Sequence, residues 1–250
     1  MARSSRRPPS PDATHAPSAW TLNEGDCLHG LAGLADGSVD VVITDPPYEA
    51  EAHTAQRMVA RAGGRLECEP IAFPPITEEQ RTESARHMAR LARRWILVFS
   101  QVEAAMKWRA ALEAGGAAYK RTCLWVKPDG KPQYSGDRPG IGYESIVACH
   151  APGRSTWNGG GSHGVFIVNK GGDPRTGHQT QKPLALMARL LRLFSDPGEL
   201  VLDPFTGSGS TGVAAIRLGR RFLGWELNPA YAEIARKRMA AAREQLELGV

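Results

Sequence analysis

The sequence predicts a single α/β domain built on a doubly wound, mostly parallel sheet. Short apolar or β-branched runs alternate with amphipathic stretches along most of the chain, which is typical of βαβ units. A length of 250 residues allows one sizeable core and leaves little room for two. The composition, 42% hydrophobic and 23% charged, is that of an ordinary globular protein and excludes a collagen-like chain, a coiled coil or a chain disordered throughout.

The elements follow from these patterns in chain order. Residues 1–18 are rich in Arg, Ser and Pro and lack apolar periodicity, so we expect a disordered tail ahead of a domain spanning 19–250. Amphipathic spacing predicts helices at 78–93, 102–114, 183–194 and 229–246, with an Ala-rich helix at 213–218. Apolar runs predict strands at 39–44, 95–100, 122–126, 144–149, 165–168, 200–203 and 221–226.

Two long stretches, 49–76 and 151–177, break this alternation. They contain Gly-Gly and Pro-Pro pairs or longer glycine runs. Long irregular segments in a compact domain are commonly binding loops or lids. We therefore predict a mobile loop at 49–76 and a substrate-facing loop at 151–177.

Composition limits the partners, metal sites and cellular location that we expect for the protein. The 31 Lys and Arg residues exceed the 26 Asp and Glu residues by five, a mild balance that permits a polyanionic partner without pointing to one. The four cysteines are far apart and the histidines lack ligand spacing, which argues against a metal site or a disulfide framework. Neither a membrane-spanning apolar run nor a signal peptide is recognisable. These features predict a cytoplasmic protein without a metal or a membrane partner.

A glycine loop near the C-terminal end predicts a nucleotide-like cofactor. Gly207, Gly209 and Gly212 form a G-x-G-x-x-G pattern between an apolar strand and a helix, where the backbone turns sharply and free N–H groups face a ligand. Glu226 ends the next strand, where an acidic side chain binds a ribose diol. Asp203 at the strand tip would repel a pyrophosphate and suits a cationic ligand such as S-adenosylmethionine. A Walker A loop is excluded because no Lys follows the glycines.

A second motif, Asp45-Pro46-Pro47-Tyr48, follows an apolar strand directly. The prolines fix the backbone and leave a rigid rim that presents a carboxylate, carbonyl oxygens and an aromatic ring together. An exocyclic amine on a base needs that set: acceptors for its hydrogens and a ring on which the base stacks. A proline-rich strand end with a capping Asp is the plainer alternative.

These motifs, taken in order, resemble the β-type amino-methyltransferases of DNA, in which DPPY precedes the glycine loop. The resemblance covers about residues 20–239 and includes LNEGDC at 22–27, HQTQKP at 178–183, SDPGE at 195–199, DPFTGSGS at 203–210 and GWELNP at 224–229. It implies a circularly permuted, seven-stranded class I S-adenosylmethionine-dependent methyltransferase sheet, Rossmann-like with one antiparallel strand, to which residues 19–23 contribute. The cofactor-binding half then comes last, a permutation that is physically cheap when domain termini lie close together.

The resemblance also implies roles for individual residues. Asp45 and the carbonyl of Pro46 would accept hydrogen bonds from the target amine, next to Pro47, and Tyr48 would stack on a flipped base. Cys27 is read equally well as a small core residue. The residues that the resemblance assigns to the cofactor are Asp26, Cys27, Asp45, His178, Thr180, Lys182, Asp203, Phe205, Gly207, Ser208, Gly209, Ser210, Glu226, Leu227 and Asn228. Among them Glu226 would bind the ribose, Asp26 and Cys27 the adenine, and His178, Thr180 and Lys182 the methionine carboxylate.

The implied function is site-specific methylation of double-stranded DNA, as in restriction-modification systems, with S-adenosylmethionine as cofactor and a homodimer as one possible assembly. The short stretch 151–177 would then read the target, with Arg154 and Trp157 as DNA contacts, although Trp157 is equally a loop anchor. Asp45 favours adenine N6 over cytosine N4, because the family's cytosine enzymes more often begin this motif with Ser. Cytosine N4 remains the alternative. An NAD-dependent oxidoreductase and a catalytically silent DNA-binding relative are more remote ones.

Overall fold

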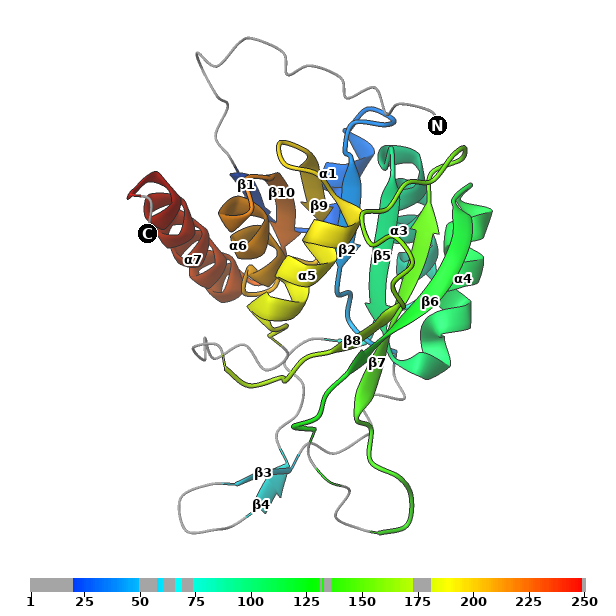
Figure 1. Ribbon diagram of the computed structural model, residues 1–250, viewed down its shortest axis with the longest axis vertical. Coiled ribbons are helices and arrows are strands. Elements are labelled where there is room, and N and C mark those ends of the chain that lie inside the picture. Colours follow the sequence, from blue (N-terminus) through cyan, green and yellow to red (C-terminus); the bar gives the residue numbers. More distant parts are fainter. Residues whose placement is uncertain are drawn as a thin grey trace.

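The computed structural model of the protein describes residues 20–49, 58–60, 66–68, 74–130, 132, 136–172 and 181–248 (Figure 1). Residues 58–60 and 66–68 are described by their backbone alone. The predicted tail at 1–18 lies outside this part, as does most of the predicted loop at 49–76.

The predicted doubly wound α/β sheet is present. Its eight strands correspond to the seven apolar runs predicted as strands together with residues 19–23, one more than the seven strands that the resemblance implied. All neighbouring strands pair in parallel except β7, which runs antiparallel to β5 and to β6. The strand predicted at 165–168 is β8, a short edge strand beside β6. In spatial order the strands are β1 (Trp20–Glu24), β10 (Arg221–Glu226), β9 (Leu200–Asp203), β2 (Val41–Thr44), β5 (Trp95–Ser100), β7 (Tyr143–His150), β6 (Ala118–Val126) and β8 (Val165–Ile167).

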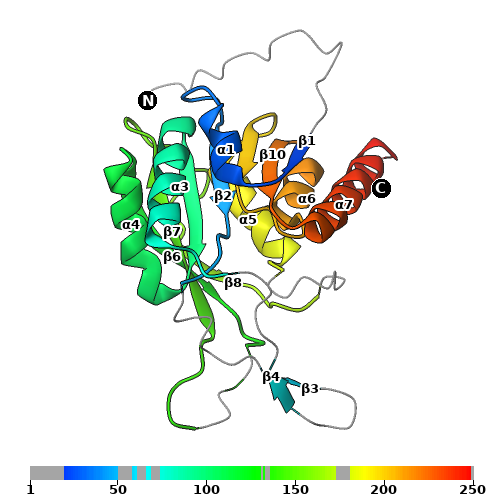
Figure 2. The same cartoon turned by 180° about the vertical axis from the view of Figure 1, so that it is seen from behind.

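Helices cover both faces of the sheet. One face carries α5 (Leu184–Phe194), α6 (Ser210–Arg217) and α7 (Pro229–Leu248), which lie in front of the strands in Figure 1. The opposite face, seen in Figure 2, carries α1 (Cys27–Ala32), α3 (Glu78–Leu91) and α4 (Ala105–Ala114), the last preceded by the short 3₁₀ helix η1 (Val102–Ala104). No described helix is long and apolar enough to cross a membrane.

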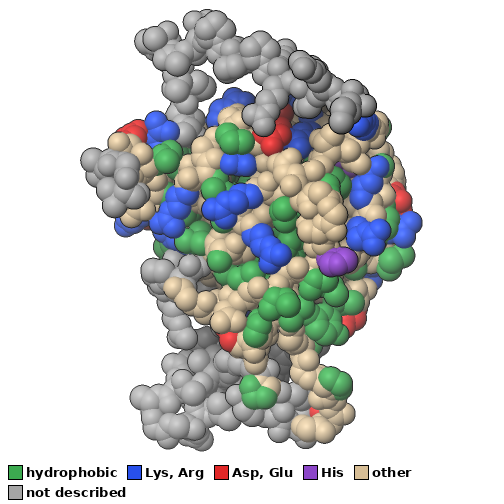
Figure 3. Space-filling view, viewed as in Figure 1, with side chains coloured by type: hydrophobic (Ala, Val, Ile, Leu, Met, Phe, Trp, Pro, Cys, Tyr) green, Lys and Arg blue, Asp and Glu red, His purple; other side chains and the backbone are tan. Residues whose placement is uncertain are grey.

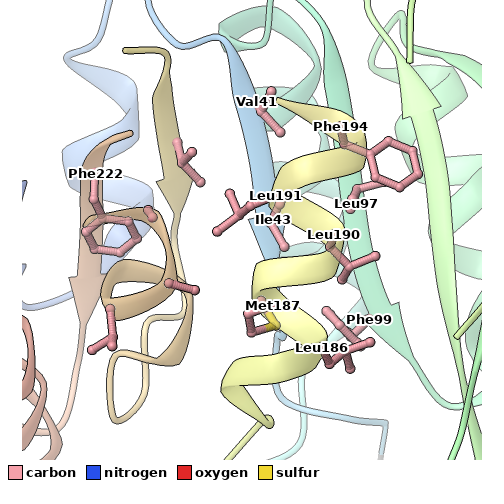
Figure 4. Close-up of a cluster of buried hydrophobic side chains, with 14 of the residues drawn as sticks. Val41, Ile43, Leu97, Phe99, Leu186, Met187, Leu190, Leu191, Phe194 and Phe222 are labelled. Atoms are coloured by element: carbon pink, nitrogen blue, oxygen red, sulfur yellow. The ribbon is translucent and has the colours of Figure 1, made fainter. Parts of the chain in front are cut away.

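Two hydrophobic cores explain why the central strands are apolar without interruption. Val41 and Ile43 of β2 face the cluster under α5, whereas Val42 between them faces the cluster under α3. Helix α5 buries Leu186, Met187, Leu190, Leu191 and Phe194, a spacing that places all five on one stripe against the sheet (Figure 4). A strand covered on both faces shows a continuous apolar run instead of alternation.

The differences from the predicted elements have local causes. Helix α1 was not predicted because it has only six residues, and its start depends on the side chain of Asp26, which accepts a hydrogen bond from the Leu28 N–H at 2.9 Å. A hairpin of β3 (Met58–Ala60) and β4 (Leu66–Cys68) lies within the predicted loop at 49–76. Figure 1 shows this hairpin projecting beyond the end of the main sheet.

The connections create a crevice at the middle of the sheet. From β9 the chain passes through α6 to β10 on one side, whereas from β2 it passes through α3 to β5 on the other, with the two helices on opposite faces. The strand order therefore reverses between β9 and β2, and ligands of such sheets bind outside the carboxyl ends of the strands at that point. Figure 3 shows Lys and Arg side chains spread over the face of α5, α6 and α7 without gathering into one patch.

Candidate active site

A cavity of about 560 Å³ opens at the switch point, within the size range of cofactor and substrate pockets. The two motifs that the sequence analysis singled out meet there, although residue 45 and residue 203 are far apart in the chain. Of the predicted site residues, those that line the cavity are Asp26, Cys27, Asp45, Pro46, Pro47, Tyr48, Lys182, Asp203, Phe205, Gly207, Ser208, Ser210, Glu226, Leu227 and Asn228.

Asp45 stands at the tip of β2 with one oxygen engaged and one free. Its Oδ2 accepts a hydrogen bond from the ammonium group of Lys182. Its Oδ1 is buried and has no hydrogen-bond partner among the described residues. A buried acceptor without a donor is costly in a folded protein, so such a group at a cavity wall favours a ligand that donates.

Tyr48 lies beside Asp45 on the same rim. Its hydroxyl donates to Glu144 Oε2 at 2.6 Å, and its carbonyl accepts from the Ile76 N–H at 3.2 Å. The next residue, Glu49, forms a buried ion pair with Arg81 of α3 at 2.6 Å. These contacts fix the end of the DPPY rim against the body, so that the ring of Tyr48 keeps one orientation.

Burial and opposing charges act together on the ion pair at the rim. Burial raises the pKa of Asp45, the ammonium of Lys182 lowers it, and the carboxylate of Glu144 raises it again, with a net upward direction. Burial lowers the pKa of Lys182, but Asp45 and Glu144 outweigh that effect and raise it. Lys182 is therefore protonated at neutral pH.

Asp203, which was predicted to contact the cofactor, is buried, and both of its carboxylate oxygens accept hydrogen bonds from the protein. Its Oδ1 accepts from the Thr44 hydroxyl at 2.7 Å and from the Phe205 N–H at 3.1 Å. Its Oδ2 accepts from the Thr211 hydroxyl at 2.6 Å. Burial raises the pKa of this carboxyl to about 6. The side chain thus closes the turn of the glycine loop and contributes negative charge to the cavity wall.

The glycine loop is held by Glu226. The Gly207 N–H donates to Glu226 Oε2 at 2.7 Å, and the Asn228 N–H donates to Oε1 at 2.8 Å. Gly207 has a φ of 55°, a left-handed conformation that suits glycine. Each carboxylate oxygen retains acceptor capacity beyond these bonds, so Glu226 can still bind a hydroxyl donor.

The structure does not bring every predicted residue to the cavity. Gly209 does not line it: with a φ of 86°, it faces α7, and a Cβ there would lie 3.0 Å from the Cβ of Ala235. Close packing against α7 thus explains why position 209 is a glycine. His178 and Thr180 lie outside the described residues.

Arg154 and Trp157 lie at the opposite end of the sheet from the cavity. The loop that carries them follows His150, which pairs with Trp95 at the amino end of β5. The Trp157 indole donates to the Gly160 carbonyl at 2.9 Å, and its ring lies 5.7 Å from that of Phe194. The anchoring role proposed as the alternative for Trp157 accounts for these contacts. Further along the predicted loop, Lys170 does line the cavity.

The sequence analysis did not predict Glu144, which contacts both Tyr48 and Lys182. It begins the apolar run of β7, and a lone carboxylate at the head of such a run was the available signal. Ser210 was predicted, and its buried hydroxyl has no hydrogen-bond partner among the described residues, as for Asp45 Oδ1. Cys27 is 6% exposed and lines the cavity, and burial raises the pKa of its thiol to about 12, so both interpretations of this residue fit.

Comparison with known proteins bears on the family. Residues 157–237 match the family of N6 and N4 methyltransferases described as DNA methylase. The predicted resemblance to the DNA amino-methyltransferases is confirmed. The chain is 28% identical over 232 residues to the candidate methylase YubD of Escherichia coli (strain K12), covering 90% of this chain and 92% of that one. A shorter match of 67 residues, 51% identical, links it to the type II methyltransferase M2.DpnII of Streptococcus pneumoniae and spans about a quarter of each chain (27% and 25%).

Solved structures support the class I methyltransferase fold. The complex of M1.HpyAVI with SAM superposes with a TM-score of 0.68 at 24% identity, over 88% of this chain and 98% of the other. The candidate DNA modification methylase TTHA0409 from Thermus thermophilus, complexed with S-adenosyl-L-methionine, gives 0.65 at 24% identity, over 88% and 93%. The cytosine-N4-specific PvuII DNA methyltransferase gives 0.68 at 14% identity, over 93% and 95%.

Proposed function

We propose that this protein transfers a methyl group from S-adenosylmethionine to the exocyclic amine of a base in double-stranded DNA, with adenine N6 as the target. The observation that carries the proposal is the free Oδ1 of Asp45, a buried acceptor beside the ring of Tyr48 in a cavity shared with the glycine loop. The exocyclic amine of a base would donate the missing hydrogen bond to Asp45, and the ring of the same base would stack on the ring of Tyr48.

The cavity fits the cofactor on observations of its own. The buried hydroxyl of Ser210 is without a partner among the described residues and lies on the glycine-loop side, where a polar ligand would satisfy it. Glu226, Asp26 and Asp203 line the cavity. In this proposal Glu226 accepts from the ribose, Asp26 accepts from the adenine, and Asp203 supplies negative charge nearby. When bound, S-adenosylmethionine supplies an electrophilic methyl group on a sulfonium. Both named structural neighbours with this ligand share the fold.

The residues of the rim then favour attack by a poor nucleophile. The lone pair of a base amine is conjugated with the ring, and hydrogen bonds from its N–H groups to Asp45 and the Pro46 carbonyl favour a more tetrahedral nitrogen. The negative charge of Asp45 stabilises the positive charge that develops on that nitrogen. Because the amine lies inside a duplex, the nucleotide must first turn out of the stack at a cost of a few kcal/mol.

Adenine is preferred over cytosine because Asp45 begins the motif, as in the adenine enzymes that the sequence resembles. Cytosine N4 is the second candidate, and the likeness to the PvuII enzyme shows that the same fold hosts that activity. The more remote reading, an NAD-dependent oxidoreductase, leaves the DPPY rim without a purpose.

Calorimetry with two cofactors, followed by a transfer assay, tests the proposal. We expect saturable binding of S-adenosylmethionine, no binding of NAD, and transfer of labelled methyl groups from the bound cofactor to unmethylated double-stranded DNA. Binding of NAD alone would favour the oxidoreductase. Binding of neither cofactor would favour a catalytically silent relative. RNA is assayed in parallel as a second substrate, and labelled RNA with unlabelled DNA would overturn the choice of substrate.

A further inference from the structure

A balanced cluster of charges lies directly behind the DPPY rim. The Lys182 ammonium binds Asp45 Oδ2 and lies 3.3 Å from Glu144 Oε2. Glu144 accepts from the Tyr48 hydroxyl at 2.6 Å through Oε2 and from Lys127 Nζ at 2.9 Å through Oε1. Two carboxylates and two ammonium groups therefore neutralise one another, and Glu144 contacts both ammonium groups as well as the Tyr48 hydroxyl.

Lys182 is buried among aromatic side chains, so its ammonium group needs the two carboxylates as partners. Only 8% of its side chain is exposed, and its ammonium lies 5.1 Å from the ring centre of Phe99, 5.6 Å from that of Tyr48 and 6.0 Å from that of Trp125. A cation among aromatic rings gains some attraction from them but loses most of its water. The two carboxylates are therefore what keeps it in place.

The position of Glu144 is fixed by the sheet. It pairs in register with Trp125 of β6, and the next residue, Ser145, donates from its hydroxyl to the Ser100 carbonyl at 2.9 Å. The indole of Trp125 in turn donates to the Val168 carbonyl at 2.8 Å. The start of β7 is thus held between β5 and β6, and Glu144 lines the cavity.

We propose that Glu144 is a positioning residue of the methyl-transfer site, which holds the Tyr48 ring for the base and the Lys182 ammonium against Asp45. This inference rests on the proposed function. It gives Lys182 a role different from the cofactor-carboxylate contact that the resemblance implied, because its ammonium group is engaged by the carboxylates of Asp45 and Glu144.

The charge cluster predicts opposite effects for its two central members. The charged and titratable groups that face Asp45 are Lys182, Glu144, Lys127 and the Tyr48 hydroxyl, with Asp203 on the neighbouring strand β9. Lys182 lowers the pKa of Asp45 and Glu144 raises it. Since the ionised carboxylate is the active form, the acid limb of kcat should move up in pH without Lys182 and down in pH without the charge of Glu144.

The experiment measures kcat against pH at saturating cofactor and DNA for the wild type and for Lys182→Gln, Glu144→Gln and Glu144→Asp. We expect the acid limb of Lys182→Gln to rise by about 1–3 pH units, the range for loss of an opposite charge at this distance. That of Glu144→Gln should fall. Glu144→Asp retains the charge but shortens the reach to Tyr48, so its kcat should fall with the limb unmoved. Asp203 is unchanged in every variant, so its own titration is common to all the profiles.

Cofactor affinity gives a readout that does not depend on turnover. We expect Lys182→Gln and Glu144→Gln to bind S-adenosylmethionine within about threefold of the wild type, because this proposal directs both side chains to Asp45 and Tyr48 and not to the cofactor. A loss of tenfold or more in Lys182→Gln would overturn the inference, and so would unmoved acid limbs in an active enzyme. A wild-type protein that binds the cofactor but methylates no DNA would instead refute the proposed function. Tyr48→Phe, which removes the hydroxyl and leaves every charge, should lower kcat far less in Glu144→Gln than in the wild type.

Discussion

Replacement of Asp45 by Asn tests the chemistry of the rim with little change in shape. The substitution removes the negative charge beside the developing positive charge on the base amine. Loss of one preorganised group of this kind lowers kcat by about 10²–10³, equivalent to about 2.7–4 kcal/mol. Asp45→Ala, which removes the acceptor altogether, should abolish turnover.

The structure also limits how far replacement of Asp45 should lower the free energy of unfolding. Breaking a buried ion pair costs about 3–5 kcal/mol when it leaves a charge uncompensated. Lys182 keeps Glu144 at 3.3 Å, and the Asp45 side chain is 20% exposed, so we expect a loss below that range, about 1–2 kcal/mol in the free energy of unfolding. Urea titrations of both variants would measure it.

The assay pairs labelled-methyl transfer to DNA with calorimetric titration of S-adenosylmethionine. We expect kcat to fall as stated while the cofactor Kd stays within about threefold, because Asp45 lies on the base side of the cavity. Asp36→Asn serves as the matched control, since that side chain is 79% exposed, pairs with Arg90 and does not line the cavity. A cofactor affinity that falls as much as kcat, or a variant that keeps its turnover, would refute the reasoning.

Three further predictions concern the cofactor side of the cavity and the core. Glu226→Gln should weaken binding of S-adenosylmethionine about tenfold by calorimetry, with kcat at saturating cofactor changed less; an unchanged Kd would contradict the ribose role. The pKa of Asp203, raised from 3.8 to about 6, means that the folded state binds its proton more tightly, so its contribution to stability is fully present below pH 3.8 and is lost as pH rises through 6. The difference in urea stability between the wild type and Asp203→Asn should therefore change by about 3 kcal/mol between pH 3.5 and 7, and a flat difference would show that burial does not perturb this group. Gly209→Ala should destabilise the protein by about 2–4 kcal/mol, because φ is 86° and the new Cβ would lie 3.0 Å from Ala235. Gly198→Ala is the control: its φ is 83° but the space around it is open, so it should cost only about 1–2 kcal/mol. Equal losses of stability in thermal unfolding would contradict the packing argument.

The sequence predicts well what depends on neighbouring residues. Strands β5, β9 and β10 begin and end where the apolar runs do, since strands covered on both faces leave an uninterrupted pattern. The glycine loop and the DPPY rim follow from their local motifs, and both line the same cavity because β9 and β2 are neighbours.

What the sequence does not reveal are contacts between residues far apart in the chain. Lys182 and Asp45 are separated by 137 positions, and Tyr48 and Glu144 by 96, so no spacing pattern connects them. The orientation of Gly209 toward α7 depends on how two helices pack, and the distance of Trp157 from the cavity depends on the direction of β7. These are properties of the tertiary arrangement, which local patterns do not encode.

The central claim, methylation of adenine N6 in DNA, is tested most directly by mass spectrometry of nucleosides. Unmethylated double-stranded DNA is incubated with the protein and S-adenosylmethionine, digested to nucleosides and analysed, with the Asp45→Ala protein as the blank. We expect N6-methyladenine that is absent from the blank. N4-methylcytosine in its place would contradict the choice of base, and the absence of any methylated base from a protein that binds the cofactor would contradict the account as a whole.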